Sequence, residues 1–216
     1  PHLTGILLSL RDGGLRTVAT DSYRLAVKTT KLPQPTDISI EANVPAKALD
    51  EATRLASSSE QVVITLGERQ IKFAAGAYEL TSRLIDGQFP DFEQLLPDTY
   101  EHELDVDSAE LIDAVRRVGL MAQRNTPLKL AFSEGELRIS AQTADIGEGS
   151  ETMPLANYVG DPIEIGFNAE FFREGLESSK SERVTLKLIS PFRPGLIEAG
   201  EDGEFRYLVM PIRLNV

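Results

Sequence analysis

Basic side chains spaced seven residues apart are the feature of this sequence with the clearest chemical meaning. Lys47 precedes Arg54 by seven residues, and Arg173 precedes Lys180 by the same interval. Seven residues are two helical turns, so each pair lies on one helix face. A third basic group consists of Arg116, Arg117 and Arg124. A solvated face explains each group alone, but three such faces in one chain favour a shared basic surface.

Catalytic chemistry has little support in the sequence. Asp21 and Arg24 could serve as an acid and a charge clamp, but no Ser-His pair or Gly-rich phosphate loop accompanies them. Asp and Ser side chains hydrogen-bond their own backbone, so residues 20–22 are better explained as a turn. The segment from Asp86 to Pro90 is likewise interpreted as a shaped loop.

Metal chemistry is also disfavoured. The chain has no Cys, which excludes a thiolate zinc site and a disulfide framework. His2 and His102 have no partner at metal-ligand spacing. The acidic run from Asp98 to Asp107 lacks the spaced ligands and central Gly of a calcium loop, so we interpret it as a solvated linker. We predict no cofactor.

Charge and hydropathy limit the partners. The net charge of -12 argues against nucleic acid, although a basic stripe on an acidic body is compatible with it. No apolar run is long enough for a membrane span, and the first residues lack a signal-peptide pattern. The sequence begins without Met, and we interpret it as an internal fragment. A soluble cytoplasmic location is expected.

The elements that must position these groups follow from apolar periodicity. A strand from Arg16 to Ala19 enters the turn and leaves through Tyr23 to Val27. Pro211 interrupts the last apolar run, which should therefore lie at a sheet edge or bulge. The other predicted strands are Leu3–Leu10, Ile38–Ala42, Gln61–Leu66, Ile71–Ala75, Tyr78–Leu84, Leu128–Phe132, Leu137–Ala141, Ile163–Phe167, Val184–Ile189, Gly195–Ala199 and Phe205–Val209. The predicted helices are Pro45–Ala56, Ser108–Gln123 with Ser108 as N-cap, and Glu170–Ser179 with Asn168 as N-cap.

The chain contains an internal repeat. GGLRTVATDS, at residues 13–22, resembles GELRISAQTA at residues 135–144, and Leu15 and Leu137 are 122 positions apart. The strand and helix that start at Ile40 resemble those that start at Glu164 at nearly the same offset. The second copy opens with the helix from Ser108, for which the first copy has no counterpart. We therefore predict two copies of one α+β unit, with the first copy truncated.

Four motifs resemble one known family. ATDSYRLAV, GQFPDF, GFNAEF and the terminal YLVMPIRL occur in the order found in the bacterial DNA polymerase III β subunits, the sliding clamps. The resemblance covers nearly the whole chain. It implies repeated clamp domains, each with antiparallel sheets outside and two helices on the inner face. Residues 1–100 would be a middle domain truncated at its N-terminus, and residues 101–216 the C-terminal domain.

The resemblance implies a non-catalytic processivity factor that encircles duplex DNA as a head-to-tail homodimer. Lys47, Arg54, Arg173 and Lys180 would face the DNA without reading its sequence. The helix from Ser108, with Leu120 near the contact, would serve the dimer, although this fragment alone should not close a ring. A cytoplasmic, nucleoid-associated location is implied, with no membrane contact.

The family's docking groove is the second implied site. It would bind the DNA polymerase III α subunit, the clamp loader and repair polymerases through a short linear motif with Gln and a Leu-Phe type pair. Matching positions are Leu3, Thr20, Ser22, Tyr23, Arg24, Leu25, Pro90, Leu95, Asn168, Phe171, Phe192, Pro194, Leu208, Val209, Met210, Pro211, Ile212 and Arg213. Leucines and Val209 would form the floor, Met210 would adapt its shape, and Arg24 and Asn168 would orient the peptide.

The chain departs from the best-known members at several groove positions. Ser22 and Tyr23 replace a Gly-His pair, Gln94 stands where Arg is frequent, and residues 189–195 are unusual in carrying two prolines. These changes bear on partner preference and pocket width. The alternative function is a non-catalytic repeat α+β module that binds a peptide without encircling DNA, and convergence of the helix-face cations on one concave surface distinguishes the two. An enzyme is the third class.

Overall fold

The computed structural model of the chain describes residues 2–11, 13–32, 38–57, 59–122, 126–144 and 147–214. The chain falls into two compact units, a first unit of residues 1–21 and 27–92 and a second unit of residues 22–26 and 93–216. Each unit has its own hydrophobic core. The domain boundary between residues 100 and 101 stays a prediction.

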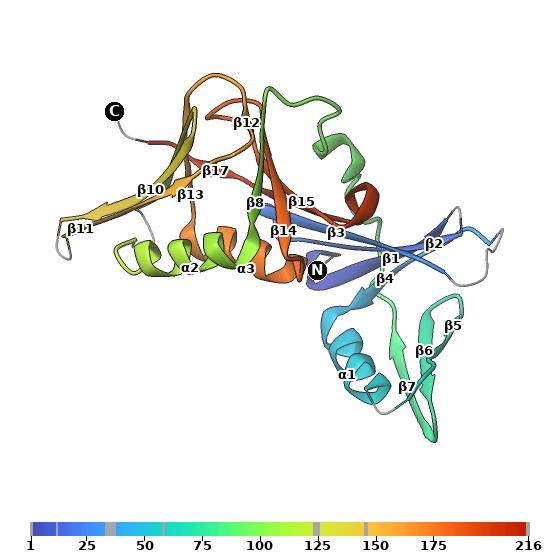
Figure 1. Ribbon diagram of the computed structural model, residues 1–216. Coiled ribbons are helices and arrows are strands. Elements are labelled where there is room, and N and C mark those ends of the chain that lie inside the picture. Colours follow the sequence, from blue (N-terminus) through green and yellow to red (C-terminus); the bar gives the residue numbers. More distant parts are fainter. Residues whose placement is uncertain are drawn as a thin grey trace. The chain divides into compact units, whose positions relative to one another are not determined.

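The first unit contains two sheets and one long helix (Figure 1). One sheet has the order β3-β2-β1-β4, and a three-stranded sheet has the order β5-β6-β7. Helix α1 contacts β4, β6 and β7. Buried Ile71, Phe73 and Ala75 alternate along β6, as the period of a half-buried strand requires. The elements are η1 (His2–Thr4), β1 (Gly5–Arg11), β2 (Gly14–Thr20), β3 (Arg24–Lys31, which begins in the second unit), β4 (Ile40–Pro45), α1 (Ala46–Ala56), β5 (Val63–Leu66), β6 (Gln70–Ala75) and β7 (Tyr78–Arg83).

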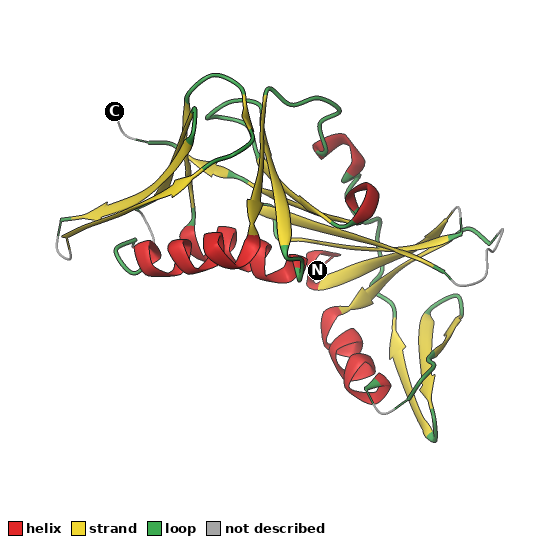
Figure 2. Ribbon diagram, in the orientation of Figure 1, coloured by secondary structure: helices red, strands yellow, loops and turns green. Residues whose placement is uncertain are grey.

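The second unit also combines two antiparallel sheets with helices, which Figure 2 distinguishes by colour. One sheet has the order β12-β8-β14-β15-β16, followed by the first residues of β3, and the other has the order β11-β10-β9-β13-β17. Helix α2 contacts α3 and both sheets, and α3 contacts β15 and β16. The elements are η2 (Glu93–Leu95), β8 (His102–Asp107), α2 (Ser108–Gly119), β9 (Leu128–Ser133), β10 (Glu136–Thr143), β11 (Gly147–Pro154), β12 (Tyr158–Val159), β13 (Ile163–Phe167), α3 (Ala169–Ser179), β14 (Arg183–Leu188), β15 (Gly195–Ala199), η3 (Glu201–Gly203), β16 (Phe205–Val209) and β17 (Pro211–Ile212).

The two units repeat one topology, as the sequence predicts. In the first unit β1 pairs antiparallel with β2 and β4, and in the second unit β9 pairs antiparallel with β10 and β13. A helix follows each of β4 and β13, and three antiparallel strands complete each copy. The repeated α+β architecture is therefore confirmed.

The end of the chain changes sheets at one residue. Strand β16 pairs with β15, Met210 follows it, and β17 pairs with β13 at the edge of the other sheet. Pro211 has no backbone N–H to donate, so an edge position suits it. The prediction that the terminal run lies at a sheet edge is confirmed for Pro211 and Ile212 and wrong for Tyr207–Val209, because β16 has a neighbouring strand on each side.

The acidic segment differs from the prediction. His102, Leu104 and Val106 are buried and alternate with acidic residues along β8, which pairs with β14 over its whole length. The linker interpretation is therefore wrong for residues 102–107. The acidic residues of β8 alternate with apolar ones that face the core, and the high negative charge of the segment made this alternation easy to miss.

Helix ends differ in detail. Asp107 caps α2, because its Oδ1 accepts a hydrogen bond from the Glu110 backbone N–H at 2.9 Å, so Ser108 is the first helical residue instead of the predicted N-cap. The helix ends at Gly119, and the predicted end at Gln123 lies outside the described residues. Asn168 caps α3 as predicted. At the start of the chain, Leu3 belongs to η1 instead of a strand.

Candidate functional site

Tyr23 and Met210 are joined at one point of the second unit. Ser22, the last residue before Tyr23, has φ of 75°, which turns the chain sharply into β3. The Met210 backbone N–H donates a hydrogen bond to the Tyr23 carbonyl at 2.9 Å. Both side chains remain exposed, Tyr23 by 64% and Met210 by 47%. The two motifs at opposite ends of the sequence therefore meet, with an aromatic ring and a flexible thioether facing solvent.

Phe171 and Glu174 of α3 extend this arrangement. The Tyr23 and Phe171 ring centroids are 6.4 Å apart, and the Arg24 guanidinium carbon lies 4.2 Å from the Phe171 centroid. Arg24 also forms an ion pair with Glu174. We call these five residues, Tyr23, Arg24, Phe171, Glu174 and Met210, the Tyr23–Phe171 cluster. The Arg24 guanidinium thus contacts the Glu174 carboxylate and the face of the Phe171 ring. Because it is held by both, this arginine helps to orient Phe171 in addition to any contact with a ligand.

The start of α3 fixes the position of Phe171. The Asn168 side-chain oxygen accepts a hydrogen bond from the Phe171 backbone N–H at 3.0 Å. The Tyr207 hydroxyl donates to the Phe171 carbonyl at 2.9 Å. One residue of the cluster is thus held by a helix cap and by a buried tyrosine of β16.

The other predicted groove residues differ in exposure. Leu25, Leu208 and Val209 are buried, whereas Leu95 and Phe192 are exposed by 53% and 72%. Leu3, Thr20 and Pro90 belong to the first unit and are half-buried. The remaining predicted positions of the second unit are Pro194, half-buried, Pro211 and Ile212 in β17, and Arg213, exposed after it. Their contact with a peptide stays a prediction.

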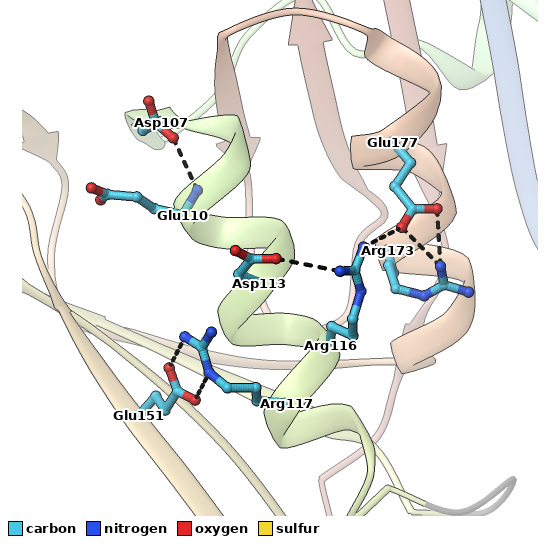
Figure 3. A network of polar contacts seen from close by, with 8 residues as sticks. All are labelled: Asp107, Glu110, Asp113, Arg116, Arg117, Glu151, Arg173 and Glu177. Atoms are coloured by element: carbon cyan, nitrogen blue, oxygen red, sulfur yellow. Dashed lines mark hydrogen bonds and ion pairs between the residues drawn. The ribbon is translucent and has the colours of Figure 1, made fainter.

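Ion pairs cover much of α2 and α3, as Figure 3 shows. Arg117 Nε and Nη2 donate to the two Glu151 carboxylate oxygens at 2.6 and 2.7 Å. This hydrogen bond lowers the pKa of Glu151 and raises the pKa of Arg117. Arg173 and Arg116 share Glu177, with nearest contacts of 2.8 and 3.4 Å.

The four residues predicted to face DNA fall into two kinds. Arg54 pairs with Asp50 and Glu51 at 3.0 Å on its own helix, and Arg173 pairs with Glu177. Lys47 and Lys180 are exposed and have no ion-pair partner among the described residues. Arg124 of the third basic group lies outside the described residues.

Sequence reasoning missed the acidic partners. Asp50 with Arg54 and Arg173 with Glu177 have the four-residue spacing of helical ion pairs, so the sequence contained that signal. Glu174 and Glu151 pair with residues far away in the sequence, and no local pattern indicates them.

Neither a metal centre nor a membrane span was found in the described residues. No group of three potential ligands among His, Cys, Asp and Glu was found there. His102 Nδ1 lies 2.9 Å from the Tyr158 hydroxyl, so this histidine has a structural contact. No described helix is long and apolar enough to cross a membrane.

The repeated α+β units, each with antiparallel sheets and a helix that follows β4 or β13, define a protein built of clamp domains. Residues 1–91 match the DNA polymerase III beta subunit, central domain, and residues 93–213 match the DNA polymerase III beta subunit, C-terminal domain. The chain belongs to the DNA polymerase III beta subunit family.

Named relatives agree with this assignment. The beta sliding clamp of Streptomyces coelicolor is 33% identical over 100% of this chain and 60% of its own length. The beta sliding clamp of Chlamydia trachomatis is 34% identical over 99% of this chain and 51% of its own length. The crystal structure of the Bacillus subtilis DNA polymerase sliding clamp superimposes with a TM-score of 0.94 at 29% identity, over 100% of this chain and 58% of that one. The chain thus spans between half and two thirds of these relatives.

Proposed function

We propose that the chain is part of a DNA sliding clamp, a non-catalytic processivity factor that encircles duplex DNA as a ring-shaped dimer. The observation that carries this proposal is the match of both units, over nearly every residue, to consecutive domains of the family. The exposed Leu120 that follows α2 suits the predicted dimer contact. A cytoplasmic, nucleoid-associated location follows from the same role.

The Tyr23–Phe171 cluster is the core of the proposed docking groove. Its exposed Tyr23 and Met210 offer apolar surface for the Leu and Phe of a linear motif, and the thioether adapts to their shape. Asn168 and Arg24 act by holding Phe171. The proposed ligands are the DNA polymerase III α subunit, the clamp loader and repair polymerases.

Competition in a replication assay tests this function. The isolated chain should take up the linear motif of a bacterial replicative polymerase and so shorten the products of clamp-dependent synthesis. Extension without a clamp should not change. A chain with Arg24→Ala and Met210→Ala should no longer inhibit, whereas Glu164→Gln, a change on β13, should inhibit like the wild type. Equal inhibition by all three chains would contradict the proposal that Arg24 and Met210 belong to a docking groove.

The alternative is a repeat peptide-binding module that does not encircle DNA. The pairing of Arg54 and Arg173 with acids on their own helices favours it, because paired arginines attract phosphate weakly. Phosphate contacts of a clamp that is held by topology need only be weak, so the same pairs are compatible with a clamp. Substituting Lys47 and Lys180 by Ala should lower the salt dependence of DNA retention by a clamp, and an unchanged salt dependence would favour the alternative.

A further inference from the structure

We propose that Glu177 restrains DNA binding by the second unit, because it holds Arg116 and Arg173 in one neutral cluster. The inference rests on the proposed function and assigns a role to an acidic residue on the DNA-facing side. Glu177 is a positioning residue that acts through the two arginines.

The carboxylate of Glu177 bridges two helices. Arg173 Nη1, on the same helix α3, donates to Glu177 Oε1 at 2.8 Å and to Oε2 at 2.9 Å. Arg116 Nη2, on α2, donates to Glu177 Oε1 at 3.4 Å. The second nitrogen of Arg116 reaches Asp113 Oδ1 at 3.4 Å. Figure 3 shows the contacts of Arg116 and Arg173 meeting at Glu177 between the two helices, with Asp113 on the other side of Arg116.

Two arginines and two carboxylates leave the cluster without net charge. A phosphate that approaches these arginines therefore meets no net positive field until Glu177 gives up its contacts. The Glu177 and Arg173 side chains are 35% and 32% exposed, so solvent screens their pair only in part. Arg116 is 60% exposed, and its contacts at 3.4 Å are the weaker ones. The arginines can leave a carboxylate to bind a DNA phosphate, but the phosphate must compete with the carboxylate that already binds the arginine.

Asp113 contacts Arg116 alone, and Glu177 is the one acid seen to join Arg116 to Arg173 in the described residues. Glu151 binds Arg117 from strand β11 and contacts neither Arg116 nor Arg173 through any hydrogen bond seen in the described residues. Glu164 pairs with Lys129 at 3.2 Å within the sheet formed by β9 and β13. Replacing Glu164 removes the same charge as replacing Glu177 without freeing a helix arginine, which makes it a matched control.

The test is an NMR titration of the 216-residue chain with a short blunt DNA duplex, followed through arginine side-chain Nε–Hε signals. We expect Glu177→Gln to bind more tightly than the wild type and Glu164→Gln to bind like it, apart from a small shift from net charge. Glu177→Gln would make two additional phosphate contacts. A rise from about 50 mM to about 150 mM salt should therefore reduce its affinity for DNA by about sevenfold more than it reduces the wild-type affinity. The Arg116 and Arg173 signals should shift together.

Three outcomes would overturn the inference, and only the third would also reject DNA contact by these helices. Equal gains in affinity and equal salt dependence for Glu177→Gln and Glu164→Gln would show that only net charge matters. DNA-induced shifts confined to arginines other than Arg116 and Arg173 would reject the role of Glu177 without rejecting DNA contact by the second unit. If no signal of any chain responded to DNA, both the inference and DNA contact by these helices would be rejected.

Discussion

Ser22 shows how one residue positions the Tyr23–Phe171 cluster. Its φ of 75° lies in the left-handed region, where the family resemblance places a glycine. A serine tolerates this conformation at a cost, and the resulting turn brings Tyr23 beside Phe171. The turn at this position therefore requires a residue that accepts a positive φ.

Replacing Ser22 by a β-branched residue should destabilise the protein. Ser22→Val should lower the free energy of unfolding by about 1–3 kcal/mol, because a β-branched side chain fits poorly at positive φ. Ser22→Gly should stay within about 1 kcal/mol of the wild type, since relief of strain and added freedom of the unfolded chain oppose each other. Urea unfolding measures both. A valine variant as stable as the glycine variant would contradict the argument.

The pair of Arg117 and Glu151 should make stability depend on acid pH. Because the hydrogen bond from Arg117 lowers the pKa of Glu151, the unfolded chain binds a proton at this carboxyl more readily than the folded chain. Its contribution is complete above the ordinary pKa of about 4.3 and is lost as pH falls through the lower folded value. The stability difference between wild type and Glu151→Gln should therefore shrink from neutral pH to acid pH.

Thermal unfolding at neutral pH and at a pH below the ordinary pKa of Glu measures the difference in stability between wild type and Glu151→Gln. The effect should be small, because both partners lie at the surface and solvent screens them. Glu148→Gln, on the same strand β11, has no ion-pair partner among the described residues and should show no such trend. A difference between wild type and Glu151→Gln that grew on acidification would reverse the sign and refute the account.

At the scale of elements, apolar periodicity predicted most of the fold. Ile163–Phe167, Gly195–Ala199 and Phe205–Val209 form strands with the predicted bounds. The failures have physical causes. Strand β8 was missed because its solvent side is acidic, and β12 and β17 because two residues are too few for a period to appear.

The residues alone predicted only local features of the site, such as the cap at Asn168. The grouping of residues 20–25 with residues 208–213 in one groove came from the family resemblance. The ion pair between Arg24 and Glu174 joins residues 150 positions apart, and no pattern in the sequence links them. Side-chain packing between elements decides such contacts.

Helix α3 illustrates this packing at Gly175. A Cβ at this position would lie 2.5 Å from Cδ1 and Cε1 of Tyr207, the residue that holds the Phe171 carbonyl. Gly175→Ala should lower the free energy of unfolding by about 1–2 kcal/mol, because overpacking exceeds the gain in helix propensity. Peptide binding should also weaken, since Phe171 must move with the helix. Chemical denaturation and a peptide titration measure the two effects.

Gly119→Ala is the matched control for this substitution. A Cβ there would lie 3.5 Å from the Ala169 Cβ, which is ordinary contact. We expect no loss of stability and no change in peptide binding. If Gly175→Ala behaved in the same way as Gly119→Ala, close packing on Tyr207 would not control Phe171.

At the scale of the whole molecule, one α+β topology occurs twice. Each unit has its own core and the same order of strands and helix, and the second unit gathers the first residues of β3 into its contacts. Distant segments thus share one surface, while the helices carry cations that are partly neutralised. A large negative net charge is then compatible with weak local contacts to DNA.

The most direct test of the account is binding of a fluorescent peptide with the Gln and Leu-Phe motif, measured by polarisation. The wild-type chain should bind with a dissociation constant of about 1–10 μM, equivalent to about 7–8 kcal/mol. Arg24→Ala combined with Met210→Ala should weaken binding at least about tenfold, or about 1.4 kcal/mol, and Glu164→Gln should leave it unchanged. No binding by the folded wild type, or equal binding by the double variant, would contradict the central claim.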